Sequence, residues 1–453
     1  MASVSEIVAR MRAVAPPGQH CLDGSTVALL RDLTRSLIAA SQGAAEEHAR
    51  FLAIGDRGLC LPEAELSGRL RGATVLVTGG TGCIGSTLMA QLAARNPGRL
   101  VSVSRGLTRA WPTQAKAEYS QADITDRSAM SRLISRIRPD LVFHVAAQRD
   151  PGLAEDEVHR TVSTNVLGTL NVLTAAAEAQ VPQVVCASTG KALRPYSPDI
   201  YAASKRAAEW LASGMAASTG MLISAGRFTH VVDNSIIYRR LLGWSAEAGG
   251  VIRLHNSEIA FYVQSALECA QLLLLACAGA QRGEFRIHAI TDLGWPVSLL
   301  DLAVAVLARS GSATPIYFSS YDRGYEETPF PGLYDPMTAG DVSPLVNAFE
   351  ARALVDSRCP LTDAFRLAMA PEPRAAKLLT ALAEVCDRTQ DPAVVRGALN
   401  ELSWSLLDAT LRATPCRDIR RAAAMAQQYG DRMGPDHRRI FEAIKDQARA
   451  VES

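Results

Sequence analysis

The sequence lacks the long apolar segments and the charge imbalance that mark several large classes of protein. The longest uninterrupted apolar runs, such as residues 272–278, are far below the roughly 20 residues that a membrane-spanning helix needs. A count of 47 Lys and Arg against 46 Asp and Glu leaves a net charge of +1, which gives no overall attraction to nucleic acid or to an anionic membrane surface. We therefore expect no membrane span and no nucleic-acid partner.

The nine cysteines do not form a metal-binding or redox pattern. No Cys-x-x-Cys pair occurs, and no histidine lies near a cysteine at ligand spacing. The odd number of cysteines and their apolar neighbours indicate reduced, mostly buried thiols and no metal site. The first residues, which are acidic and polar by position 6, lack the charged start and apolar core of a secretion signal, so we expect a cytoplasmic protein.

A glycine-rich segment at residues 73–85 follows a short β-branched run and leads into a helical pattern. Gly79 would let the chain turn off a strand, Gly82 would let the backbone approach a pyrophosphate, and Gly85 would let the next helix pack closely. The phosphates would lie at the N-terminus of that helix, where N–H groups and the helix dipole favour an anion. An ordinary glycine-rich turn is the alternative. The residues of the predicted dinucleotide cradle are Gly79, Thr81, Gly82, Cys83, Ile84 and Gly85.

Strands and helices alternate after residue 73, which is typical of a parallel sheet covered on both faces. The fold class is therefore α/β: a Rossmann-type doubly wound parallel sheet, with a smaller mixed lobe and helical N- and C-terminal extensions. The predicted strands are residues 74–78, 100–104, 141–146, 183–188 and 221–227. The predicted helices between them are residues 86–95, 126–138, 157–180 and 200–217.

The length of 453 residues predicts two or three structural units. Helices are predicted at residues 4–14 and 26–54, and Asp391 followed by Pro392 indicates a helix start near the C-terminus. The predicted domains are a helical N-terminal extension (1–70), a dinucleotide-binding domain (71–228, with parts of 229–300 returning to it), a substrate-binding lobe (229–372) and a helical C-terminal region (373–453).

The end of the second predicted strand (100–104) and the segment at residues 123–124 indicate which cofactor is bound. An NAD-specific cradle usually has an acidic residue there for the ribose 2′-hydroxyl, whereas this chain has Ser104 and Arg105. These side chains would hydrogen-bond and neutralise a 2′-phosphate, so NADP is favoured over NAD, with an exposed loop arginine as the alternative. A further short strand is expected just before Asp123 and Ile124. These two residues fit an adenine ring, but Asp123 could equally cap the next helix.

A hydroxyl-bearing strand end and a Tyr-x-x-x-Lys pair carry the predicted chemistry. Ser188 and Thr189 follow each other at the end of a strand, and Tyr201 and Lys205 lie four residues apart on one face of the next helix. The Lys205 ammonium and a positively charged nicotinamide ring would stabilise the Tyr201 phenolate, making it an acid or base near neutral pH. The hydroxyl of Ser188 or Thr189 would hold the oxygen that loses or gains the proton.

Together these segments resemble the extended short-chain dehydrogenase/reductases. They are most similar to the polysaccharide-biosynthesis branch, which contains UDP-N-acetylglucosamine 4,6-dehydratases and related dehydratase/epimerases. The resemblance covers residues from about 55 to about 410, and the residues after it look like an addition. The segments that carry it are residues 70–80, 104–105, 123–126, 142–147, 164–173, 187–192, 201–206 and 226–228.

The resemblance implies a mechanism, a set of site residues and a homo-oligomer. NADP⁺ would take hydride from C4 of a hexose while Tyr201 removes the hydroxyl proton. The 4-keto group would then acidify the C5–H, water would leave from C6, and the hydride would return from NADPH to C6. Asn165 would face the site, and Lys191 would be a second base or a ligand of the keto oxygen. Ala146 and Ala147 would let the cofactor approach closely, and Tyr201 and Lys205 would also bind the cofactor. The implied substrate-binding residues are Gln148, Lys191, His230, Asn234 and Arg253.

Departures from the family pattern leave the reaction open. The family's strand-end motif Ser-Thr-Asp-Lys has Gly190 at the position of the acid, and a positioned proton donor typically contributes about 10²–10⁴-fold in rate. Thr229 and His230 replace a Gly-Asn pair. Ala260 stands where the family has an arginine for the sugar diphosphate; Arg253 would replace that arginine or be an ordinary surface residue.

These observations predict an NADP-dependent enzyme that acts on a nucleotide sugar by transient C4 oxidation, followed by dehydration or epimerisation. One alternative is a ketoreductase or C4 epimerase without elimination, since Gly190 replaces the expected acid. The other is a non-catalytic dinucleotide-binding scaffold, because a fold does not by itself define a function.

Overall fold

The computed structural model describes residues 2–106, 110–247, 249–322, 325, 332–333, 343–350, 353–367, 373–428 and 435–452. The chain divides into two compact units. The smaller unit consists of Met1–Arg57, His230–Ala266 and Leu293–Asp322. The larger unit consists of Gly58–Thr229, Leu267–Asp292 and Arg323–Ser453.

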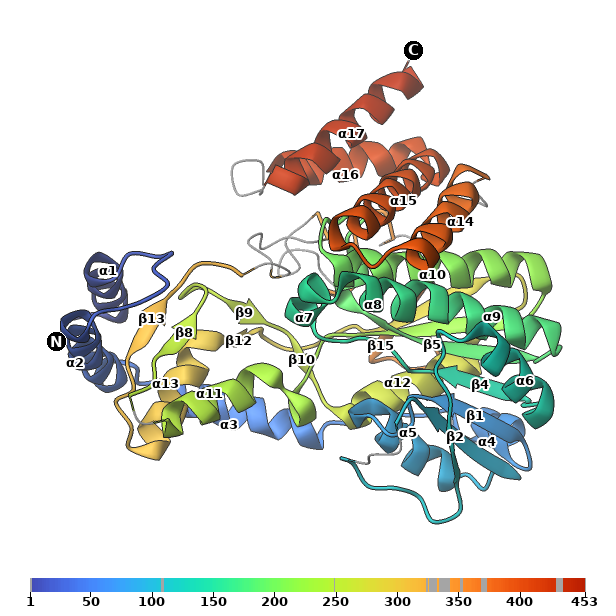
Figure 1. The fold of residues 1–453 in the computed structure, drawn as a ribbon, viewed down its shortest axis with the longest axis horizontal. Coiled ribbons are helices and arrows are strands. Elements are labelled where there is room, and N and C mark those ends of the chain that lie inside the picture. Colours follow the sequence, from blue (N-terminus) through green and yellow to red (C-terminus); the bar gives the residue numbers. More distant parts are fainter. Residues whose placement is uncertain are drawn as a thin grey trace. The chain divides into compact units, whose positions relative to one another are not determined.

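The described strands of the larger unit form one nine-stranded sheet (Figure 1). They are β1 (Thr74–Thr78), β2 (Arg99–Ser104), β3 (Glu118–Gln121), β4 (Leu141–His144), β5 (Gln183–Thr189), β6 (Leu222–Phe228), β11 (Phe285–Ile290), β14 (Leu354–Val355) and β15 (Thr362–Arg366). Their order is β14-β15-β11-β6-β5-β4-β1-β2-β3. All pairs from β11 to β3 are parallel, whereas β15 pairs antiparallel with both β11 and β14. The predicted doubly wound α/β fold is confirmed.

Helices cover both faces of this sheet. They include α5 (Cys83–Ala93), α6 (Arg127–Ile137), α9 (Gly168–Glu178), α10 (Ile200–Thr219) and α12 (Ala266–Gly279). Ile223 of β6 is buried in one cluster with Leu173 of α9 and Ala207 of α10. Ser224, the next residue, faces the opposite side, where its hydroxyl donates to the carbonyl oxygen of Ala276 in α12 at 2.7 Å. Burial on both faces explains why the central strands are continuous apolar runs.

The predicted strands match the observed ones to within two residues at each end. The helix predicted at 157–180 is interrupted: α8 (Val158–Val162) leads into a π-helical turn at Ser163–Leu167, after which α9 begins. Turns of this kind occur frequently at functional sites.

In the smaller unit, the N-terminal helices share one core with residues that follow β6. Its elements are α1 (Val4–Val14), α2 (Gly24–Ala40), α3 (Ala44–Ala53), β7 (His230–Val231), α11 (Ile236–Ala246), β8 (Ile252–Leu254), β9 (Ala260–Phe261), β10 (Val263–Gln264), β12 (Val297–Ser298), α13 (Leu299–Ser310) and β13 (Ile316–Phe318). Met11 of α1 and Leu30 of α2 are buried together with Ile316 of β13. Because each helix has an apolar stripe that must be covered, the N-terminal residues join this core instead of forming the separate extension that we predicted.

The C-terminal region is helical, as predicted from its sequence. It contains α14 (Pro373–Arg388), α15 (Pro392–Ala413), α16 (Cys416–Gln428) and α17 (Pro435–Glu452) (Figure 1), and α15 packs against α10. Asp391 caps α15 by accepting a hydrogen bond from the N–H of Ala393 at 2.8 Å, with Pro392 at the first helical position. Throughout the described part of the chain, every helix is too short or too polar to cross a membrane.

Candidate active site

The glycine loop after β1 has the geometry of a phosphate cradle. Gly79 has a φ of +76°, and its N–H donates to the carbonyl oxygen of Val103 at 2.7 Å. A Cβ on Gly79 would lie 2.8 Å from the backbone nitrogen of Ala146, and a Cβ on Gly85 would collide with the carbonyl oxygen of Gly79. Gly82 is the N-cap residue of α5 and is exposed. Because glycine has no side chain, Gly82 does not cover the first N–H groups of that helix. The loop therefore fits the pyrophosphate of a dinucleotide.

The other predicted cradle residues lie close to this loop. Cys83 and Ile84 form the first turn of α5, and Ala146 packs directly against Gly79, beside Ala147. Thr81 donates to the hydroxyl of Ser104 at the end of β2, at 2.9 Å.

Arg105 is exposed, and its carbonyl oxygen accepts a hydrogen bond from Gln121 in β3 at 2.8 Å. The ends of β1 and β2 are therefore joined by side chains, with an arginine at the position predicted for a 2′-phosphate.

The segment predicted to hold adenine is engaged in local contacts. The Asp123 carboxylate accepts hydrogen bonds from the N–H and the hydroxyl of Thr125, both at 2.9 Å. Asp126, rather than Asp123, caps α6. Ile124 is buried, and a Cβ on Gly168 would lie 2.8 Å from its side chain. Ile124 therefore offers little surface to a ligand, which argues against the adenine contact that we predicted for it.

The end of β5 separates the two candidate hydroxyl groups, because successive side chains of a strand point to opposite faces. Ser188 is buried, and its hydroxyl donates to the Glu209 carboxylate at 2.6 Å. Thr189 hydrogen-bonds to the Tyr201 hydroxyl and accepts a hydrogen bond from the backbone N–H of Lys191 at 3.3 Å. Of the two alternatives, the geometry favours Thr189 as the partner of Tyr201.

Tyr201 and Lys205 lie in the first turns of α10, where burial shifts the pKa of each side chain. Burial raises the pKa of Tyr201, while the Thr189 hydrogen bond and the positive charge of Arg149 act in the opposite direction. Burial lowers the pKa of Lys205, whose ammonium donates to the carbonyl oxygen of Ala187 at 2.7 Å. Burial thus outweighs the two opposing effects on Tyr201, and stabilisation of its phenolate by Lys205 together with a bound nicotinamide stays a prediction.

Asn165 lies in the π-helical turn and is fully engaged by the protein. Its amide oxygen accepts from the N–H of Gln148 at 2.8 Å, and its amide nitrogen donates to the carbonyl oxygen of Gln148 and to the hydroxyl of Ser204, both at 3.1 Å. The Gln148 side chain in turn accepts hydrogen bonds from the N–H groups of Arg149 and Asp150. In this structure, Asn165 and Gln148, which we predicted as site residues, therefore hold the backbone of the loop after β4.

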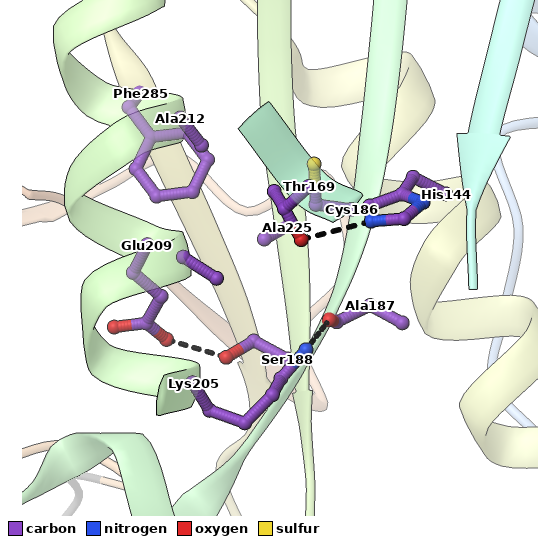
Figure 2. A pocket seen from close by; sticks show the side chains of 11 residues that line it. His144, Thr169, Cys186, Ala187, Ser188, Lys205, Glu209, Ala212, Ala225 and Phe285 are labelled. Carbon is purple, nitrogen blue, oxygen red and sulfur yellow. Dashed lines mark hydrogen bonds between the residues drawn. The ribbon is translucent and has the colours of Figure 1, made fainter. Parts of the chain in front are cut away.

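A small cavity lies between β5, β6 and α10, behind the strand end (Figure 2). It is lined by His144, Thr169, Cys186, Ala187, Ser188, Lys205, Ala208, Glu209, Ala212, Ala225 and Phe285. His144 hydrogen-bonds to Thr78 through Nδ1 at 2.8 Å and to Thr169 through Nε2 at 3.0 Å. Burial, together with the charge of Lys205, lowers the pKa of His144 to about 3, so the ring is neutral. Burial raises the pKa of the Cys186 thiol to about 12, which excludes a thiolate nucleophile at neutral pH.

A buried ion cluster that we did not predict lies beside this cavity. Arg227 of β6 is fully buried and contacts Glu209 and Glu350, each at 2.7 Å. Arg206 pairs with the same Glu350 at 2.9 Å. Burial would lower the pKa of Arg227, but the two carboxylates raise it above its usual value. The sequence contained one signal for this cluster: Glu209 lies four residues after Lys205, which places both on one face of the helix. No local sequence pattern indicated that Glu350 would join them.

Three predicted substrate residues belong to the smaller unit. His230 hydrogen-bonds through Nε2 to the hydroxyl of Ser235 at 2.6 Å, and Asn234 lies in a short 3-10 turn. Arg253 donates to the carbonyl oxygens of Gln19 and His20 and lies over the ring of Tyr317. Because Arg253 holds the N-terminal segment, the structure argues against the substrate contact that we predicted for it.

A parallel sheet with a glycine loop after its first strand, together with a Tyr-x-x-x-Lys pair beside a strand-end hydroxyl, defines the class as an extended short-chain dehydrogenase/reductase. The chain belongs to the polysaccharide biosynthesis protein family, whose model matches residues 75–321. The fold and the family match confirm the resemblance to the polysaccharide-biosynthesis branch that the sequence motifs predicted.

Individual proteins that are similar to this chain include a probable polysaccharide biosynthesis protein and a nucleotide-sugar dehydratase. The chain is 28% identical over 290 residues to EpsC of Bacillus subtilis (strain 168), a probable polysaccharide biosynthesis protein, covering 60% of this chain and 48% of EpsC. It is 28% identical over 172 residues to the UDP-N-acetylglucosamine 4,6-dehydratase (inverting) of Campylobacter jejuni, covering 36% and 50% of the two chains. The chain thus spans about half the length of these curated relatives. The X-ray structure of Pen from Bacillus thuringiensis shares the fold, with a TM-score of 0.55, 21% identity and coverage of 67% of this chain and 91% of Pen.

Proposed function

We propose that this protein is an NADP-dependent enzyme that oxidises C4 of a nucleotide-activated sugar transiently and then dehydrates or epimerises it. The observation that carries the proposal is the contact of Tyr201 with Thr189, one turn from Lys205 on α10 and in the same unit as the glycine loop. The named activity of the Campylobacter jejuni relative supports the substrate class.

The residues have separate roles in this proposal. The glycine loop would hold the dinucleotide pyrophosphate, with Ser104 and Arg105 placed for a 2′-phosphate. A bound nicotinamide would supply hydride transfer to and from the sugar carbon. Tyr201 would take the proton of the sugar hydroxyl, and Thr189 would orient that oxygen. Because its pKa is raised, Tyr201 is protonated before the ligands bind, and the positive charge of Arg149 works against this shift.

A second candidate, a C4 epimerase or ketoreductase that does not eliminate water, is favoured by the packing at Gly190. A Cβ at this position would lie 2.7 Å from Cδ2 of Leu345, and Leu345 is itself buried. The space next to Gly190 is therefore filled by an apolar side chain, where the family has an acid. Chemistry that needs only Tyr201, Lys205 and Thr189 would be unaffected by this substitution.

Two measurements test the proposal. Native mass spectrometry of the purified protein should identify a co-purifying dinucleotide; NADP is expected, and NAD would overturn our interpretation of Ser104 and Arg105. The same spectrum tests our proposal of a homo-oligomer. Incubation with NADP⁺ and UDP-N-acetylglucosamine or UDP-glucose should then give a 4-keto-6-deoxy product, lighter by one water, if the dehydratase proposal is correct. A 4-epimer of unchanged mass would support the second candidate, and no hydride exchange across a panel of nucleotide sugars would indicate a non-catalytic scaffold.

A further inference from the structure

The start of α10, one residue before Tyr201, is capped by a side chain from another helix. The N-cap residue Asp199 makes no side-chain capping hydrogen bond to α10. Instead, the backbone N–H of Ile200 donates to Oε1 of Glu155 at 2.8 Å. Glu155 is buried in α7 (Pro151–Asp156). A carboxylate at a helix N-terminus satisfies an N–H group and complements the helix dipole, so Glu155 acts as the cap of α10.

The charge of this buried cap is neutralised from the C-terminal region. Oε2 of Glu155 lies 2.7 Å from Nη2 of Arg396 in α15. A buried carboxylate is strongly disfavoured unless it is paired and hydrogen-bonded. One oxygen of Glu155 therefore caps α10, while the other is held by Arg396.

The same face of α15 also holds the segment that leads to Tyr201. Arg396, Asn400 and Trp404 are spaced four residues apart, so they lie along one side of the helix. The Tyr196 hydroxyl donates to Oδ1 of Asn400 at 2.6 Å, and the Tyr196 ring stacks on Trp404 with centroids 4.0 Å apart. The segment 196–200 is therefore held at both ends, directly by α15 at Tyr196 and through Glu155 and Arg396 at Ile200.

We propose that Arg396 and Glu155 are positioning residues that set the start of α10 and thereby hold the Tyr201 hydroxyl at Thr189. The inference rests on the proposed role of Tyr201 as the acid and base. It gives the C-terminal helices a part in supporting the active site through Glu155, although the family match ends at residue 321.

The test uses the full chain and three variants, Arg396→Gln, Arg396→Lys and Glu155→Gln. Arg412→Gln is the matched control: it lies on the same helix, is about half exposed, and pairs at 3.3 Å with Asp408 of that helix. Hydrogen exchange should accelerate about tenfold or more at residues 196–203 in Arg396→Gln and stay unchanged in Arg412→Gln. With UDP-N-acetylglucosamine and NADP⁺, kcat should fall about 10–100-fold in Arg396→Gln with little change in KM, because small displacements of a reacting group have effects of this size. Arg396→Lys should recover part of the loss.

Glu155→Gln keeps an oxygen that can accept from Ile200 but removes the buried charge. Adding Arg396→Gln to Glu155→Gln should therefore cost little more, giving a clearly non-additive cycle. Equal exchange in Arg396→Gln and Arg412→Gln, or fully additive effects, would overturn the inference. Full activity of Tyr201→Phe would instead overturn the proposed function, so the two failures are distinguishable.

Discussion

The cofactor loop and the catalytic strand end of the larger unit are held in place by different means. The loop at residues 79–85 is fixed mainly by its own backbone, since Gly85 packs on the carbonyl oxygen of Gly79 and the N–H of Gly82 bonds to the same residue. The strand end at Ser188 and Thr189 depends on side chains far along the chain. Glu350 and Leu345 pack behind it, and Arg396 holds the cap of the helix that follows. Dinucleotide binding should therefore be a local property, whereas catalysis should depend on long-range packing.

The largest difference between effects on catalysis and effects on dinucleotide binding is expected for substitution of Tyr201. Tyr201→Phe should lower kcat by about 10²–10⁴-fold, the usual contribution of a positioned proton donor or acceptor. NADP⁺ affinity, measured by calorimetry, should be unchanged because the hydroxyl contacts Thr189 and not the glycine loop. Gly85→Val is the converse variant and should abolish NADP⁺ binding. Loss of NADP⁺ affinity in Tyr201→Phe would contradict the claim that dinucleotide binding is a local property of the glycine loop.

Acid should destabilise the region behind the strand end through His144. The folded pKa is about 3 and the usual value is 6.5, so the unfolded chain binds a proton below pH 6.5 that the folded protein does not. Stability is therefore fully present above pH 6.5 and is lost as the pH falls toward 3, by at most about 5 kcal/mol at 1.36 kcal/mol per pKa unit. Urea unfolding at neutral and mildly acidic pH should show a smaller pH dependence in His144→Gln than in the wild type. The exposed-site control His20→Gln should match the wild type, and an unchanged pH slope in His144→Gln would contradict this account.

The buried ion cluster should contribute more to stability than any exposed pair near the cofactor loop. Arg227→Met leaves Glu209 and Glu350 without their main partner, and removal of one member of a buried pair costs about 3–5 kcal/mol. Arg99→Met, which breaks an exposed pair with Glu118 between β2 and β3, should cost no more than about 1 kcal/mol. Denaturant unfolding compares the two variants, and equal losses would show that the strand end is not held by the cluster.

The smallest effect distinguishes the two neighbouring hydroxyl groups. Ser188→Ala removes a hydrogen bond to a buried carboxylate and should cost about 1.5–3 kcal/mol of stability, with little effect on kcat. Thr189→Val should do the reverse, because its hydroxyl contacts Tyr201. Steady-state kinetics and denaturant unfolding on both variants test this, and a larger fall in kcat for Ser188→Ala would reassign the role to Ser188.

The same contrast explains what could be predicted from the sequence. The five predicted strands, the glycine loop and the cap at Asp391 were predictable, because each depends on a run of neighbouring residues with a local physical signature. The strands β11, β14 and β15, which extend the sheet beyond β6, were not predicted. The choice between Ser188 and Thr189 was not, since it depends on Glu209 occupying one face of β5. The joining of the N-terminal helices to residues after 229 involves pairs that are distant in sequence and have no local pattern. The same holds for the packing of Leu345 beside Gly190, the pairing of Glu350 with Arg227, and the pairing of Arg396 with Glu155.

The central claim is transient oxidation at C4 by a Tyr201-dependent site. The most direct test is incubation of the protein with NADP⁺ and UDP-N-acetylglucosamine deuterated at C4, followed by mass spectrometry and NMR of the sugar and the cofactor. The account predicts that the C4 deuterium moves, reaching C6 of a dehydrated product or returning to C4 of an epimer, and that Tyr201→Phe prevents this. Deuterium that stays at C4 with unchanged configuration and never appears on the cofactor, for this sugar and for UDP-glucose, would contradict it.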